Sequence, residues 1–229
     1  MISAGCRVEI DRTRRFATKT ANNQRMQQIQ QDTQTVFIVD DDPSIRFAMR
    51  ALLDSVNIKH EIFASGDEFL DSDSDMRSGC LVLDIRMPGL GGLELQEELL
   101  NRGSTLPIIF ITGHGDVPMA VEAMQKGAVD FIQKPFRDQE LLDRIREALK
   151  TDSERRKEQR KHSAVADRVA RLTNREREVF DLVVTGKPNK VIAYELGVSQ
   201  RTVEIHRARV MEKMRAKSLA DLVKMHIMK

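Results

Sequence analysis

The sequence predicts an α/β fold, a five-stranded doubly wound parallel sheet, followed by a small all-α helix-turn-helix domain. Short aliphatic segments alternate with amphipathic helical segments over residues 35–150, the pattern of a parallel sheet covered by helices on both faces. Later segments have helical periodicity, and two short ones meet at a tight glycine turn. Charge divides similarly: residues 35–150 carry 12 basic and 21 acidic side chains, and residues 151–229 carry 19 and 11.

The length of 229 residues allows two ordinary domains. No apolar run approaches the ~18 residues of a membrane span. The N-terminal segment lacks the apolar centre of a signal peptide. We therefore expect a cytoplasmic protein without a membrane partner. Four parts are expected: a disordered N-terminal extension (1–34), an α/β domain (35–150), a charged, helical linker (151–170) and a helix-turn-helix domain (171–229).

Five short segments have the length and aliphatic content of buried strands: VFIV (36–39), HEIFA (60–64), CLVLD (80–84), PIIFIT (107–112) and VDFI (129–132). A helix is expected after each of them. Asp42 and Pro43 suit the N-cap and first position of the first helix, and "SGDE" at 65–68 has the spacing of a capping box. Gly103 ends the third helix, and the fifth is expected over 138–150.

The C-terminal domain is predicted to be helical throughout. "TNRE" at 173–176 has the capping-box spacing and opens a helix that ends near Gly186. Asn189 is expected to cap the next helix, Gly197 to turn the chain and Ser199 to cap the long helix that follows. These two helices form a helix-turn-helix candidate with an arginine-rich second helix. The linker before this domain is expected to be solvated. A nucleic-acid-binding basic run is the alternative, which its interleaved acidic residues weaken.

Polar side chains follow the expected strands at the carboxyl edge of the sheet, where open parallel sheets bind ligands. They are Asp40, Asp41, Asp84, Thr112 and Lys134. Neighbouring carboxylates repel one another, and Mg²⁺ suits such an oxygen-rich site. Phosphoryl transfer uses this combination of groups. Asp84 is the best nucleophile, because the Met-Pro-Gly turn after it leaves its outer face open.

The segments "VDDDPSIR", "LDIRMPG", "ITGHGD" and "DFIQKPF" resemble the signature segments of response-regulator receiver domains, which have a flavodoxin-like fold. The match covers residues 35–150. The resemblance implies that Asp84 is the phosphoacceptor. It also implies a Mg²⁺ site made by Asp40, Asp41, Asp84 and the backbone carbonyl of Arg86.

The same resemblance implies roles for three further residues. Thr112 would be the switch hydroxyl, Phe131 the rotating switch aromatic residue, and Lys134 would hold the phosphoryl group before a cis peptide at Pro135. The repacked surface over residues 116–132 would then form a homodimer. A sensor histidine kinase is the implied phosphoryl donor. The protein would not be an enzyme beyond slow hydrolysis of its own acyl phosphate.

The long helix of the C-terminal domain has two expected faces. Val203, Val210 and Met214 share a core face. Three residues of the opposite face are expected to contact bases in the major groove: Glu204, Ile205 and Ala208. Four basic residues are expected to contact phosphates: Lys187, Lys190, Arg201 and Arg209. A small helical interaction module is the alternative.

The segment from Leu172 to Met214 is similar to the four-helix DNA-binding domain of the NarL/LuxR type. The order of receiver, linker and this domain resembles FixJ-type regulators. The resemblance implies a transcription regulator that binds double-stranded promoter DNA and acts with RNA polymerase. Two alternatives stay open: an aspartate-nucleophile phosphohydrolase, suggested by "VDDD", and a regulator switched by protein contact without phosphate.

Overall fold

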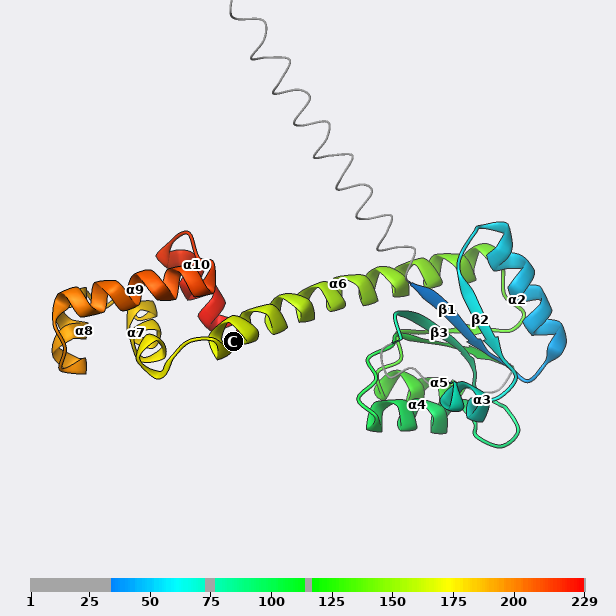
Figure 1. Cartoon of the computed structure of the whole chain (residues 1–229). Coiled ribbons are helices and arrows are strands. Elements are labelled where there is room, and N and C mark those ends of the chain that lie inside the picture. The colour runs from blue at the N-terminus through cyan, green and yellow to red at the C-terminus, as the bar shows by residue number, and fades with distance from the viewer. Residues whose placement is uncertain (1–33, 73–76, 114–116, 229) are drawn as a thin grey trace, which may run out of the picture. The chain divides into compact units, whose positions relative to one another are not determined.

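The computed structural model describes residues 34–72, 77–113 and 117–228. The chain divides into two compact units between Ser153 and Glu154, which we call unit 1 and unit 2 and describe separately (Figure 1). Apart from Gln34, the N-terminal extension expected over residues 1–34 lies outside the described residues.

Unit 1 contains a five-stranded parallel sheet, as the sequence predicts. Its strands are β1 (Thr35–Val39), β2 (His60–Phe63), β3 (Gly79–Asp84), β4 (Ile108–Thr112) and β5 (Asp130–Gln133). Their order across the sheet is β2-β1-β3-β4-β5. Every residue of β1, β3 and β4 is buried, which explains why these strands are nearly continuous aliphatic runs in the sequence.

Helices cover both faces of this sheet (Figure 1). They are α2 (Pro43–Ser55), α3 (Gly66–Asp71), α4 (Gly92–Asn101), α5 (Val117–Gln125) and α6 (Asp138–Ala170). Met49 and Leu53 of α2 pack with Leu141 of α6 on one face of the sheet. Phe69 of α3 and Leu95 of α4 belong to the core on the other face. The sheet is therefore doubly wound, with an apolar core on each side.

Side-chain caps set where the first helices begin. Asp42 caps α2 by accepting a hydrogen bond from the Ser44 amide, as predicted. Ser65 caps α3 by accepting from the Glu68 amide at 3.1 Å. The Glu68 carboxylate accepts from the Ala64 amide at 2.6 Å, so the predicted capping box closes one residue early.

The helix α6 joins two segments that the sequence predicts separately. It runs for 33 residues without a break, and so combines the helix predicted to Lys150 with the charged, helical linker predicted over 151–170. The linker contains many residues of high helix propensity, chiefly Arg, Ala, Lys and Glu, and it contains no Pro or Gly. Pairs such as Lys161 with Glu158, at 2.7 Å, add to its stability. No helix of the described residues is long and apolar enough to cross a bilayer.

Unit 2 packs the last part of α6 against the C-terminal helices α7 (Asn174–Val184), α8 (Asn189–Leu196), α9 (Gln200–Met214) and α10 (Leu219–Ile227). Phe180, Ile192 and Val203 are fully buried in their common core. The predicted capping box at the start of α7 is present, with Thr173 and Glu176 each bonded to the backbone of the other.

The turn between α8 and α9 has the predicted glycine and serine. Gly197 has a left-handed backbone with φ of 65°, and Ser199 caps α9 through its hydroxyl. The prediction that Asn189 caps α8 is wrong, because Pro188 is the N-cap residue and Asn189 is already helical. The side-chain oxygen of Asn189 instead accepts from the Arg207 guanidinium at 2.9 Å, which ties α8 to α9.

Candidate functional site

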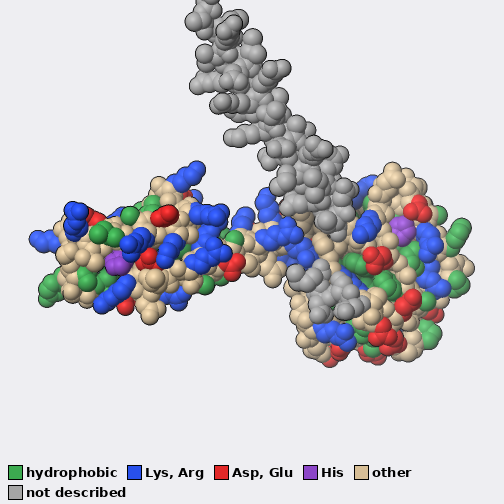
Figure 2. All heavy atoms as spheres, viewed as in Figure 1, with side chains coloured by type: hydrophobic (Ala, Val, Ile, Leu, Met, Phe, Trp, Pro, Cys, Tyr) green, Lys and Arg blue, Asp and Glu red, His purple; other side chains and the backbone are tan. Residues whose placement is uncertain are grey.

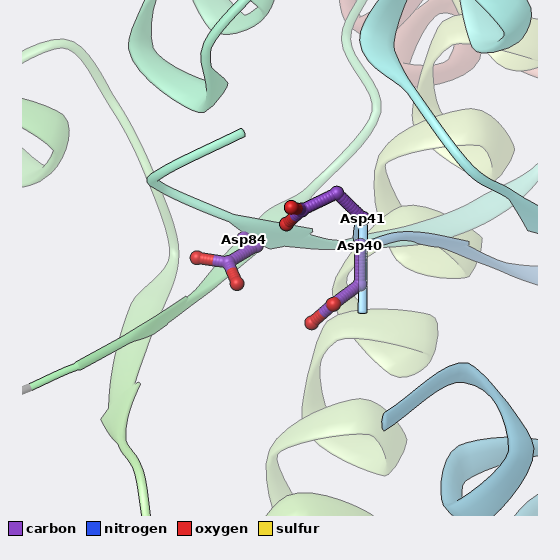
Figure 3. A group of neighbouring side chains, drawn as sticks. All are labelled: Asp40, Asp41 and Asp84. Carbon is purple, nitrogen blue, oxygen red and sulfur yellow. The ribbon is translucent and has the colours of Figure 1, made fainter. Parts of the chain in front are cut away.

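Three carboxylates meet at the carboxyl edge of the sheet in unit 1. Asp40 and Asp41 follow β1, and Asp84 ends β3. One oxygen from each carboxylate lies within 4.8 Å of the others, and Figure 3 shows them side by side. Asp40 is buried, whereas Asp41 is exposed. Hard oxygen donors that reach solvent on one side suit a divalent cation, so the chemistry of these residues fits the metal site expected from the sequence.

Lys134 joins two of these carboxylates. Its ammonium nitrogen lies 2.9 Å from Asp40 Oδ2 and 2.6 Å from Asp84 Oδ2. Burial lowers the pKa of Lys134, but hydrogen bonds to Asp84 and Asp40 outweigh this and raise it above its usual value. Burial raises the pKa of Asp40, although hydrogen bonds from Lys134 and from the Asp42 amide oppose the change. One ammonium beside three carboxylates leaves an excess of negative charge, which a cation would relieve.

Backbone groups fix the direction of two carboxylates. The Asp42 amide donates to Asp40 Oδ1 at 2.8 Å, and the Arg86 amide donates to Asp84 Oδ1 at 3.1 Å. Sequence reasoning missed Gly92, the first residue of α4. A β-carbon there would lie 2.3 Å from the backbone oxygen of Asp84, so only glycine allows this close approach. The two successive glycines at the start of α4, Gly91 and Gly92, could have indicated this close approach in the sequence.

Thr112 is the last residue of β4, the strand that pairs with β3 and its terminal Asp84. In the sheet register Asp84 is level with Ile111. Thr112 is buried, and its hydroxyl donates to the Gly113 carbonyl at 3.3 Å. Phe131 of β5 is 43% exposed, so its ring lies at the surface rather than in the core. The peptide bond between Lys134 and Pro135 is cis, as predicted.

Exposed apolar side chains lie on α5 (Val117–Gln125) and at the start of β5 (Asp130–Gln133), the elements after Thr112. Four of the six exposed large hydrophobic residues described in unit 1 lie there: Val121, Met124, Val129 and Phe131. We call these four residues the α5–β5 surface. Single exposed apolar residues are common, but a group on neighbouring elements is typical of an interaction site.

In unit 2 the two faces of α9 are as predicted. Val203, Val210 and Met214 are fully buried. The opposite residues are exposed: Arg201, Glu204, Ile205, Ala208 and Arg209. Ile205 is 47% exposed, which makes an apolar contact available on an otherwise polar face. Figure 2 shows Lys and Arg side chains over much of the viewed face of this unit.

The two basic residues predicted near the start of α8 differ from each other. Lys190 is exposed. Lys187 lies against Glu195 instead, with its ammonium nitrogen 2.7 Å from both carboxylate oxygens. A phosphate that binds Lys187 must therefore compete with Glu195, a feature that the sequence analysis did not anticipate.

Two family models match the chain. Residues 36–146 match the response regulator receiver domain, and residues 170–226 match the bacterial regulatory proteins of the luxR family. Nodulation protein W of Bradyrhizobium diazoefficiens is 50% identical over 83% of this chain and 84% of its own length. The transcriptional regulatory protein FixJ of Azorhizobium caulinodans is 45% identical over 84% of this chain and 92% of its own. The chain belongs to the FixJ-type response regulators.

A solved structure supports this membership. The response regulator StyR is similar with a TM-score of 0.81 and 44% identity, over 86% of this chain and all of the StyR chain. Like its relatives, this response regulator is a DNA-binding transcription regulator of a two-component system, with a receiver domain and a luxR-type DNA-binding domain. The alternatives of a phosphohydrolase and of a regulator switched without phosphate have no better support from these comparisons.

Proposed function

We propose that Asp84 accepts a phosphoryl group from a sensor histidine kinase. The observation that carries this proposal is the contact of Lys134 with both Asp40 and Asp84 at an edge where three carboxylates meet. A carboxylate oxygen of Asp84 attacks the phosphorus of the phosphohistidine. The P–N bond breaks, a P–O bond to Asp84 forms, and the imidazole leaves with the electron pair. Water later cleaves the acyl phosphate slowly.

We propose Mg²⁺ as the cation, held by Asp40, Asp41, Asp84 and the backbone carbonyl of Arg86. The hard oxygens of this set and the exposure of Asp41 support this choice. Bound Mg²⁺ supplies positive charge for the phosphoryl oxygens. Lys134 stays charged, because its pKa is raised, and can follow the phosphoryl group as its contact with Asp84 is replaced.

The phosphoryl group adds about −1.5 to −2 charges at neutral pH. We propose that its oxygens draw the Thr112 hydroxyl away from Gly113 and that Phe131 turns into the vacated space. The α5–β5 surface is then repacked and pairs with the same surface of a second copy. The exposure of Phe131 in the structure supports this role, since a half-exposed ring can turn inward without leaving a cavity in the core.

We propose that the dimer binds double-stranded promoter DNA in the cytoplasm, where the chromosome lies, and acts there with RNA polymerase. Glu204, Ile205 and Ala208 contact base edges in the major groove, which their exposure on α9 supports. Four basic residues contact phosphates: Lys187, Lys190, Arg201 and Arg209.

The test replaces Asp84 by Asn, which keeps the size of the side chain but removes the nucleophile. Acetyl phosphate is supplied as donor, and the covalent phosphoryl group is measured by intact mass and by its lability in base. We expect labelling of the wild type and none of Asp84→Asn. The control Asp71→Asn removes an exposed carboxylate at the end of α3 and should label normally. Labelling of Asp84→Asn would assign the acceptor to another residue.

A further inference from the structure

A buried carboxylate lies on α6 far from the acidic site. Asp152 is fully buried, although its neighbours Thr151 and Ser153 are exposed. Its Oδ2 atom accepts hydrogen bonds from the Gly79 amide at 3.0 Å and from the Ser78 hydroxyl at 3.3 Å. Burying a carboxylate is costly unless donors satisfy it, so these contacts explain how it is tolerated. In the sequence Asp152 belongs to the charged linker, where nothing distinguishes it from solvated neighbours.

Asp152 occupies a core-facing position of the helix. Leu141, Ile145 and Ala148 are buried against the sheet, and Asp152 follows Ala148 at the next position of the same helical face. An apolar residue there would pack without directional preference. A carboxylate that accepts from the Gly79 amide and the Ser78 hydroxyl sets both the rotation and the axial position of the helix. Buried polar groups have this registry role in other helical assemblies.

The partner of Asp152 is itself held tightly. Gly79 begins β3 with φ of +135°, and a β-carbon there would lie 1.8 Å from the backbone oxygen of Thr35. Only glycine fits, so the amide that Asp152 binds cannot move far from β1. A second contact acts nearby, since the Gln34 side chain donates to the Leu149 carbonyl at 2.8 Å. The N-terminal ends of β1 and β3 thus hold α6 at two points.

The strand that holds Asp152 also carries the acidic site. β3 runs from Gly79 to Asp84, so one end contacts α6 and the other bears the proposed phosphoacceptor. The helix continues unbroken from Asp152 to Ala170, across the division between the units after Ser153. The contact therefore lies one residue before the division between the units, on the helix that leads into unit 2.

We propose that Asp152 is a positioning residue that fixes the register of α6 on unit 1, and that this register makes DNA binding by unit 2 depend on the state of the receiver. The inference rests on the proposed function. Loss of the contact lets α6 turn or fray beyond Ala148. Phosphorylation of unit 1 then no longer changes DNA binding by unit 2. Phosphorylation itself is unaffected, because Asp152 lies at the opposite end of β3 from Asp84.

The experiment uses the full chain with Asp152→Leu, which fills the buried position but cannot accept a hydrogen bond. Asp152→Asn, which retains one acceptor oxygen, tests for partial rescue. Glu147→Gln, an exposed carboxylate on the same helix, is the matched control. The DNA probe is a duplex selected by phosphorylated wild type from a randomised pool. Its affinity is measured with and without acetyl phosphate, together with the labelling of Asp84 and hydrogen exchange at Gly79.

Allosteric coupling is commonly about 5- to 150-fold in affinity. We expect the affinity with acetyl phosphate, divided by the affinity without it, to show such a ratio for the wild type and for Glu147→Gln. For Asp152→Leu this ratio should fall close to one although Asp84 is fully labelled. Asp152→Asn should give a ratio between these values. A merely structural role would lower both affinities and leave their ratio unchanged. An unchanged ratio in Asp152→Leu, with faster exchange at Gly79, would contradict the inference alone. A ratio near one in the wild type would contradict the proposed function, and the inference with it.

Discussion

Asp40 and Asp41 are neighbours in the sequence but lie in different environments. Asp40 is 1% exposed, and Lys134 and the Asp42 amide hold it in place. Asp41 is exposed, because it lies beyond the end of β1, in the bend that leads to α2. Asp40 therefore orders the site, while Asp41 can exchange ligands with solvent. If Mg²⁺ binds there, removing Asp41 should weaken its binding without disturbing the fold.

Thermal unfolding with and without Mg²⁺ tests this at single-residue resolution. At ten times its Kd, a ligand stabilises the folded state by about 1.4 kcal/mol. We expect such a stabilisation for the wild type and for Asp71→Asn, and a clearly smaller one for Asp41→Asn at the same Mg²⁺ concentration. Equal stabilisation of all three proteins would show that the cation binds without Asp41.

The pair of Lys187 and Glu195 also leads to a prediction. Glu195→Gln removes the charge that competes with phosphate for Lys187. Affinity for a random-sequence duplex should rise, and the slope of log affinity against log salt should steepen by about 0.9, the value for one more phosphate contact. Glu178→Gln is the control, because it releases Arg175 on α7, outside the expected contacts. Similar slopes for both variants would show that Glu195 does not compete with phosphate for Lys187.

Residue identities at the acidic site could be predicted from the sequence, because the ends of parallel strands must meet at one edge. The pairing of Lys187 with Glu195 could not be predicted. It depends on how two long, half-exposed side chains eight positions apart choose their rotamers. The contact of Asn189 with Arg207 could not be predicted either. Asparagine is a common N-cap residue, and only the structure shows that its side-chain oxygen accepts from the Arg207 guanidinium instead.

Whole elements were predictable where a periodic apolar pattern met a buried surface. Both faces of α9 follow from helical spacing, since Val203, Val210 and Met214 repeat along one side. The full length of α6 was not predictable in this way. Beyond Lys150 the helix depends on the helix propensity of its residues and on pairs between charged neighbours. Neither produces an apolar repeat in the sequence, and the first apolar residue to join the core of unit 2 is Val165.

The two faces of α9 should separate stability from DNA binding. Val203→Ala deletes buried methyl groups and should lower the free energy of unfolding of unit 2 by about 2 kcal/mol. Ile205→Ala lies on the exposed face and should change it by less than about 0.5 kcal/mol. Denaturant unfolding and binding to the selected duplex measure both effects. Only Ile205→Ala should weaken binding at full stability; unchanged binding would remove Ile205 from the DNA contacts.

At the scale of the whole molecule, the two units differ in net charge and in their exposed apolar residues. Residues 35–150 are acidic overall and residues 151–229 basic, and the positive charge of the second part suits the DNA-binding domain that it contains. This change of charge indicates a boundary near residue 150, and the two units divide after Ser153. The α5–β5 surface was harder to predict, because the exposure of Val121 and Met124 depends on how α5 rotates against the sheet.

Phosphorylation should make the chain dimerise through that surface. Val121→Glu places a charge on an exposed residue of α5, so it should leave the fold and the labelling of Asp84 intact while preventing association. Leu100→Glu is the matched control, since Leu100 is comparably exposed on α4, outside the surface. Light scattering after treatment with acetyl phosphate should give dimers of the wild type and of Leu100→Glu, and monomers of Val121→Glu. Because a two-fold interface presents Val121 twice, the introduced carboxylates would also repel each other. Dimers of phosphorylated Val121→Glu would therefore place the interface elsewhere on the chain.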